Sequence, residues 1–161
     1  MTFSENEIRA WLEEVKDPEI PTVSIVDLGM IESIQINEDA VFVEVIPTFA
    51  GCPALRYIQE DIKSCLERHG VQNPIVTMNR TKPWSTDRIT ERGRKLILDF
   101  GLSPPPKIAP AMIELPILQN AVCPKCFSLD TRLIIPFGPT LCRAIHQCHS
   151  CLETFEQFKP L

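Results

Sequence analysis

The spacing of apolar residues predicts a helix near the start of the chain. Apolar side chains recur one helical turn apart at Ile8, Trp11, Leu12 and Val15, a spacing that places them on one face of an α-helix. Ser4 and Glu7 stand three residues apart just before this run, as a capping box requires. The pattern predicts a helix over about residues 5–16, ended by Asp17-Pro18.

Short apolar runs indicate strands in the next part of the chain. Residues 31–36 and 41–46 flank the polar segment 37–39 and predict an antiparallel hairpin. The second run is β-branched and nearly all apolar, which is typical of a central strand covered on both faces. Residues 75–78 predict a third strand.

Two further helices are expected around the third strand. Apolar residues at helical spacing (Leu55, Ile58, Ile62 and Cys65) predict one of them, with Gly70 as its stop and Cys65 as a core residue. The other follows Ser85 or Thr86 as its cap and is expected to end near Gly101. The order α-β-β-α-β-α predicts an α+β fold, with helices on one or both faces of a small mixed sheet.

The turn between the second strand and the second helix carries candidate chemistry. Gly51 permits a tight turn and Pro53 suits the first helical position, so Cys52 is the predicted N-cap. A thiol there faces unpaired amides and the positive end of the helix dipole, which lower its pKa and favour the reactive, iron-binding thiolate. The alternative is a small packed residue, and spacing alone favours it because free cysteines are often buried. Asp27 lies in another turn, and its spacing alone favours a structural role in that turn over a functional role.

Seven cysteines are spread unevenly along the chain, and five of them lie in the last 41 residues. Cys123-x-x-Cys126 and Cys148-x-x-Cys151 form two knuckles with 21 residues between them. Four thiolates at this spacing predict one zinc ion in a ribbon, and a cysteine-ligated iron–sulfur cluster is the alternative. Because protein would fill all four positions, the site is expected to be structural and to stabilise a segment too small to fold by apolar burial alone. Other candidate ligands, expected instead to pack or hydrogen-bond nearby, are Cys142, His146 and His149.

Charge and composition exclude some classes of protein. The net charge is −5, and residues 1–120 hold 12 basic and 18 acidic side chains, so nucleic-acid binding is not expected. No apolar run reaches the length of a membrane span, and the first residues lack a signal-peptide pattern, so a cytoplasmic protein with no membrane association is expected. Five prolines in residues 103–120 indicate a semi-rigid connector.

Several dispersed motifs resemble known families. Asp17-Pro18-Glu19, Asp27-Leu28-Gly29, Thr-Phe-Ala-Gly-Cys-Pro-Ala at 48–54 and Pro83-Trp84 together resemble the SufT-like family of iron–sulfur assembly factors. Joined to the C-terminal cysteine knuckles and to the segment 137–144, Phe-Gly-Pro-Thr-x-Cys-Arg-Ala, they resemble the PaaD family over nearly the whole chain. Two residues depart from the pattern: Phe127 stands where a knuckle usually has glycine, and His146 where an aromatic ring is usual.

The resemblance implies three regions: a SufT-like domain over 1–102, a connector over 103–120 and a zinc-ribbon-like domain over 121–161. It implies an accessory or maturation protein of the phenylacetyl-CoA epoxidase, a di-iron oxygenase of phenylacetate catabolism, and a non-catalytic component more than an independent enzyme. Cys52 would then relay or briefly bind iron–sulfur species, with Asp27 and Thr48 as supporting residues. The epoxidase catalytic subunits or its iron–sulfur reductase would be the partners, and a homodimer stays open. The competing hypothesis is a permanent adaptor subunit without metal transfer.

Overall fold

The structure is a computed structural model that describes residues 3–37, 40–107 and 121–159. The chain divides into two compact units, Met1–Trp84 and Ser85–Leu161, each of which is described by itself. The domain limits inferred from the resemblance remain a prediction. Of the predicted connector over 103–120, residues 108–120 lie outside the described residues.

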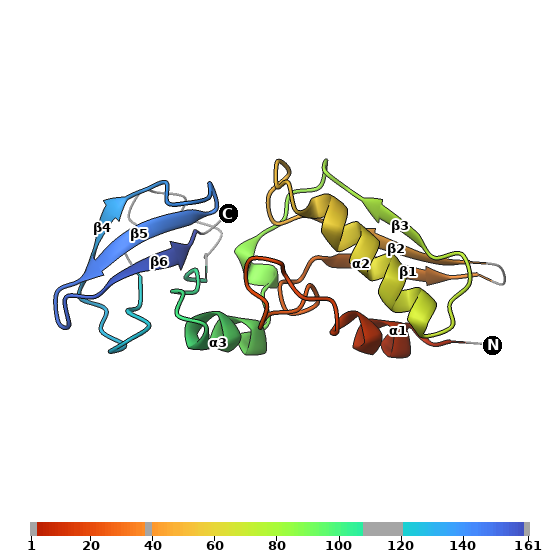
Figure 1. Ribbon diagram of the computed structural model, residues 1–161, viewed down its shortest axis with the longest axis horizontal. Coiled ribbons are helices and arrows are strands. Elements are labelled where there is room, and N and C mark those ends of the chain that lie inside the picture. Colours follow the sequence, from red (N-terminus) through yellow and green to blue (C-terminus); the bar gives the residue numbers. More distant parts are fainter. Residues whose placement is uncertain (1–2, 38–39, 108–120, 160–161) are drawn as a thin grey trace. The chain divides into compact units, whose positions relative to one another are not determined.

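The first unit contains two helices and a three-stranded sheet (Figure 1). Its elements are α1 (Glu5–Leu12), β1 (Ile31–Ile36), β2 (Val41–Val45), α2 (Leu55–Arg68) and β3 (Ile75–Met78). The strand order is β1-β2-β3, with β1 and β2 antiparallel and β2 and β3 parallel. The predicted small mixed sheet with its helices is confirmed.

Helix α1 begins as predicted but ends earlier. The Ser4 Oγ accepts a hydrogen bond from the Glu7 amide at 3.3 Å, and the Ser4 amide donates to the Glu7 carboxylate at 2.8 Å. The prediction that the helix continues to about residue 16 is wrong, because Lys16 forms an isolated β-bridge with Ser24. Val15 is still buried, so its apolar spacing reflects the core and not a helix.

The core of the first unit lies between α2 and one face of the sheet (Figure 1). Helix α2 contributes the buried residues Leu55, Ile58, Ile62, Cys65 and Leu66. Burial alternates along β2, where Phe42 and Glu44 are only half-buried. The prediction that this strand is covered on both faces is therefore wrong. Gly70 follows α2 with a φ of +87°, a left-handed conformation that glycine adopts without strain, and it confirms the predicted stop.

The second unit joins a helical segment to a cysteine-rich ribbon. Its elements are η1 (Thr86–Arg88), α3 (Glu91–Asp99), β4 (Thr131–Ile135), β5 (Arg143–Cys148) and β6 (Thr154–Phe158). Ser85 caps η1 only, and Thr90 caps α3 by accepting from the Gly93 amide at 2.9 Å. The strand order is β4-β5-β6, all antiparallel, so three strands form the predicted ribbon.

The segment after α3 is hydrogen-bonded to the ribbon. The Ser103 amide donates to the Glu156 carbonyl at 2.9 Å, and the Phe158 amide donates to the Ser103 carbonyl at 2.9 Å. Ser103 thereby pairs with Gln157 in a parallel bridge. The start of the predicted connector is thus fixed along the edge of β6.

Among the described residues, no helix has the length and apolar character needed to cross a membrane.

Candidate functional site

The motif segments of the first unit meet at one end of its sheet. The start of β1 lies opposite the end of β2, because Ile31 pairs with Val45. The parallel strand β3 ends beside the end of β2, where the Asn79 amide donates to the Val45 carbonyl at 2.8 Å. The turn before β1, the turn after β2 and the segment after β3 therefore converge, although they are far apart in the sequence.

The turn before β1 is held by a buried polar pair. The Ser24 hydroxyl donates to the Asp27 carboxylate at 2.8 Å, and the Asp27 amide donates back to the Ser24 Oγ at 3.0 Å. Asp27 is only 2% exposed. The Trp84 indole N–H donates to the Leu28 carbonyl at 2.9 Å and thereby fixes the segment after β3 against this turn. The Asp27-Leu28-Gly29 and Pro83-Trp84 motifs are far apart in the sequence, and the structure brings them together.

Cys52 lies in the turn after β2 but not at the helix cap. The N-cap of α2 is Ala54, which has no side-chain capping bond, so the predicted cap role of Cys52 is wrong. The Cys52 amide donates to the Phe49 carbonyl at 3.1 Å, which forms an additional turn before the helix. A Cβ at Gly51 would approach the Phe49 ring to 3.0 Å, so a larger residue here would require the ring to shift.

The side chains of Thr48 and Cys52 are both half-buried in this turn. Both side chains are therefore partly accessible to solvent at the end of the sheet that also carries the Asp27 turn. Within the described part of the chain, Cys52 belongs to no group of three side chains able to hold a metal ion. Any ion bound by Cys52 would need further ligands from elsewhere.

The four cysteines predicted from the two knuckles come together in the ribbon. The Cys123 and Cys151 sulfurs are 3.6 Å apart, and those of Cys126 and Cys148 are 3.5 Å apart. All four sulfurs lie within 4.8 Å of one another. Cys123 and Cys148 are buried in the small ribbon core with Ala121 and Phe155.

This geometry fits one tetrahedral ion. Zinc binds thiolate at about 2.3 Å, which places the sulfurs of a four-cysteine site roughly 3.8 Å apart. A cluster with two or four irons spreads its cysteines over different irons and would hold some sulfurs farther apart. The four-cysteine group therefore supports zinc binding.

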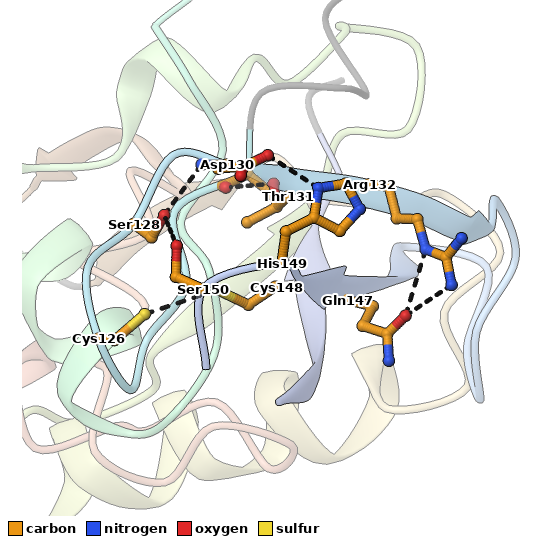
Figure 2. Close-up of polar contacts among 10 residues, drawn as sticks. Cys126, Ser128, Asp130, Thr131, Arg132, Gln147, Cys148, His149 and Ser150 are labelled. Carbon is orange, nitrogen blue, oxygen red and sulfur yellow. Dashed lines mark hydrogen bonds and ion pairs between the residues drawn. The ribbon is translucent and has the colours of Figure 1, made fainter. Parts of the chain in front are cut away.

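The two knuckles have matching backbone hydrogen bonds. The Cys123 amide donates to the Ser128 carbonyl at 3.0 Å, and the Cys148 amide donates to the Glu153 carbonyl at 2.9 Å. Figure 2 shows the link between the knuckles, where the Ser128 and Ser150 hydroxyls are 2.9 Å apart. These contacts position the sulfurs through the backbone and through neighbouring side chains.

Backbone amides also act on the sulfurs directly. The Cys151 amide hydrogen-bonds the Cys148 sulfur and, together with the Cys126 side chain and the Ser150 amide, lowers the pKa of this thiol to about 6 despite its burial. Thiolate is the form that binds a metal ion. Cys148 is thus prepared for metal binding by its own knuckle.

The three substitute ligands considered from sequence have other roles. The His149 Nδ1 lies 2.8 Å from the Asp130 carboxylate (Figure 2), and the Cys142 sulfur lies 3.2 Å from the Thr140 hydroxyl. His146 is buried and its ring stacks on Phe155 with a centroid distance of 5.7 Å. The expectation that these residues pack or hydrogen-bond nearby is confirmed, since the four-cysteine group contains none of them.

The residue after each knuckle has an unfavourable backbone conformation. Phe127 and Leu152 directly follow Cys126 and Cys151 and have φ values of 60° and 64°. Bulky residues rarely adopt this left-handed region, at a cost of about 1–2 kcal/mol each. Their side chains are 65% and 71% exposed, so little packing offsets the strain. Glycine is usual at this position of a knuckle because it adopts a positive φ without strain, but this chain has Phe127 and Leu152 there.

We expect Phe127→Gly and Leu152→Gly each to raise the free energy of unfolding of the zinc-loaded ribbon by roughly 1 kcal/mol, because glycine removes the strain. The midpoint of thermal or urea unfolding measures the change. Leu129→Gly is the matched control, since Leu129 is 70% exposed and its φ is not positive. An equal or larger stabilisation by Leu129→Gly would contradict the strain argument.

Two family models match separate parts of the chain. The model of the iron-sulfur cluster assembly protein family matches residues 5–71, and the PaaD zinc beta ribbon domain matches residues 116–159. The first range contains Asp27, Thr48 and Cys52, and the second contains all four cysteines of the ribbon. The zinc ribbon is therefore established by both the family match and the arrangement of its sulfurs.

Two solved structures resemble the chain over about three-fifths of its length. A domain of unknown function, DUF59, from Bacillus anthracis is 30% identical, with a TM-score of 0.54, and the match covers 58% of this chain and 90% of that one. A conserved hypothetical protein from Thermotoga maritima is 26% identical, with a TM-score of 0.52, and the match covers 59% of this chain and 96% of that one. The α+β fold is thus shared with these proteins.

A curated relative matches almost the whole chain. This relative, a putative 1,2-phenylacetyl-CoA epoxidase subunit of Escherichia coli (strain K12), is 34% identical over 154 residues, which cover 96% of this chain and 92% of the relative. The match includes both the part that resembles iron–sulfur assembly proteins and the zinc ribbon. On this evidence the chain belongs to the PaaD family of phenylacetyl-CoA epoxidase subunits.

Proposed function

We propose that this chain is an accessory protein that assists the maturation of metal centres in a phenylacetyl-CoA epoxidase. The observation that carries the proposal is the position of Cys52. It is a half-buried thiol at the end of the sheet where distant motifs converge, within the range matched by an iron-sulfur cluster assembly family. Iron–sulfur species or iron for a di-iron centre would be the cargo.

In this proposal Cys52 binds the cargo through its thiolate. Asp27 is fixed by Ser24 and would keep the neighbouring turn in shape, while Thr48 would contribute a hydroxyl beside the thiol. One cysteine is too few ligands for an iron–sulfur cluster, which is normally held by several thiolates. The remaining ligands would come from a second copy of this chain or from the recipient protein.

The ribbon has a different role in the proposal. Its four cysteines fill every position of a tetrahedral zinc site, so the ion would be structural and would not take part in transfer. Three large apolar side chains next to the knuckles are exposed, namely Phe127, Leu129 and Leu152. The ribbon is therefore suited to contact the epoxidase catalytic subunits or its iron–sulfur reductase.

A second candidate function is that of a permanent adaptor subunit. The observation that favours it is the name of the curated relative, which describes that protein as a subunit. In this case Cys52 would be a packing or docking residue, and the chain would remain in the complex in fixed proportion.

The two functions predict different iron contents for epoxidase components made without this chain. We expect epoxidase components from cells that lack this chain to have low iron content and low turnover, because their centres are not completed. The same components from cells that express it are the control. Full iron content, with activity restored by adding the purified chain back, would instead establish an adaptor and overturn the maturation proposal.

A further inference from the structure

A second group of side chains that could hold a metal ion lies in the first unit, and it does not include Cys52. Glu14 follows α1, while Cys65 and His69 lie four residues apart at the end of α2. Residues four apart in a helix share one face. The ligand atoms of all three side chains lie within 4.8 Å of one another.

The distances are close to those of a bound ion. His69 Nε2 lies 2.8 Å from Glu14 Oε1, and the Cys65 sulfur lies 4.0 Å from Glu14 Oε2. Around a tetrahedral zinc ion these pairs would be roughly 3.4 and 3.6 Å apart, given zinc bond lengths of about 2.0–2.3 Å. Small side-chain rotations would bring the three atoms to this geometry.

Neighbouring groups orient two of the three ligands. The His69 ring stacks on Trp11 with a centroid distance of 4.6 Å and an interplanar angle of 1°. The Cys65 sulfur lies 3.2 Å from the Trp11 carbonyl oxygen. A metal ligand held by contacts to its surroundings loses less freedom when it binds an ion. Stacking on Trp11 therefore orients His69, whereas the Cys65 thiol donates a hydrogen bond to the Trp11 carbonyl that it would give up on binding an ion as thiolate.

The three side chains differ in their exposure to solvent. Cys65 is fully buried, whereas the side chains of His69 and Glu14 are 29% and 49% exposed. An ion can reach the group from solvent and would keep one position for water.

We propose that Glu14, Cys65 and His69 form a second metal site, which takes one divalent ion of the zinc type with water in its fourth position. A thiolate, an imidazole and a carboxylate form a donor set suited to zinc and related first-row ions. The competing explanation is a latch between α1 and α2 made only of hydrogen bonds and the ion pair with Arg68, whose guanidinium is 3.3 Å from Glu14. The proposal is independent of the function proposed for Cys52.

Cobalt titration of the full-length chain, with its ribbon already loaded with zinc, tests this site. We expect one equivalent of Co²⁺ to bind, with the visible absorption of tetrahedral coordination and thiolate charge transfer from a single sulfur. Parallel measurement of zinc shows whether cobalt has displaced the ion of the ribbon. Absence of cobalt binding with the ribbon zinc retained would overturn the proposal.

Three variants separate a metal site from a latch. Cys65→Ser and His69→Gln keep the size and hydrogen bonding of each side chain, and we expect each to weaken cobalt binding at least about tenfold, as loss of a metal-site contact does. Arg68→Gln removes the ion pair of the latch but no ligand, and we expect it to retain the cobalt. His69→Gln changes a partly exposed residue and so tests the site even if Cys65→Ser fails to fold. Unchanged binding in His69→Gln, or loss in Arg68→Gln, would refute the site.

Discussion

Replacing Cys148 with alanine is expected to release one zinc ion per chain and to unfold the ribbon. Cys148 is both one of the four zinc ligands and part of the buried ribbon core, which otherwise holds little apolar area. Structural zinc contributes on the order of 10–16 kcal/mol to small domains of this kind, far more than such a core can replace. Zinc analysis and amide NMR signals of β4, β5 and β6 measure the two effects.

The first unit and Cys142 provide the controls for this prediction. Signals from β1, β2 and β3 should persist, because these strands have a core of their own. Cys142→Ala removes a half-buried thiol outside the four-cysteine group and should leave zinc content unchanged. A Cys148→Ala chain that keeps its full zinc content would show that three cysteines hold the ion.

Replacing Cys52 with alanine is expected to abolish maturation and to leave both units folded. The side chain is half-buried and does not cap α2, so its loss should change the free energy of unfolding by less than about 1 kcal/mol. The iron content and turnover of the epoxidase should fall to the level of cells that lack the chain. Thermal unfolding and zinc analysis of the purified variant check the fold.

Neighbouring residues sharpen the test of Cys52. Thr48→Val keeps the shape of a half-buried side chain but removes its hydroxyl, and it should reduce maturation less than Cys52→Ala. Cys142→Ala again serves as the control for loss of an accessible thiol. Full epoxidase activity with Cys52→Ala would refute the relay and leave the adaptor function as the explanation.

Local signals in the sequence were enough to predict most helices and strands. The start of α1 depends on Ser4 and Glu7, which interact within a single turn, so its cap can be read directly from the sequence. The end of α1 depends on pairing between Lys16 and Ser24, which the apolar spacing through Val15 conceals. Buried positions continue past the helix because the core continues there.

In the ribbon, too, local sequence patterns predict some features but not the pairing of distant residues. The spacing of the knuckles predicts the four ligands because a single tetrahedral ion demands two close pairs of cysteines. That spacing does not predict the third strand, β6. The bridge of Ser103 to Gln157 spans more than 50 residues and therefore leaves no local pattern.

The candidate sites were predictable to different degrees. The residues around Cys52 could be identified by resemblance, but the extra turn closed by the Cys52 amide and the Phe49 carbonyl, which precedes the cap at Ala54, could not. Cys65 was correctly predicted to be buried. Its proximity to Glu14 follows from the packing of two helices, which no spacing within either helix reveals.

The backbone bonds of Ser103 cover part of one edge of the ribbon sheet. A strand at the edge of a sheet presents unpaired amide and carbonyl groups, to which a strand from another molecule can add. In this chain Ser103 occupies such groups of Glu156 and Phe158, on the edge of β6 that does not pair with β5. A ribbon cut free at residue 121 would lose this cover and present an open template for aggregation. Ser103 therefore covers part of this edge of β6.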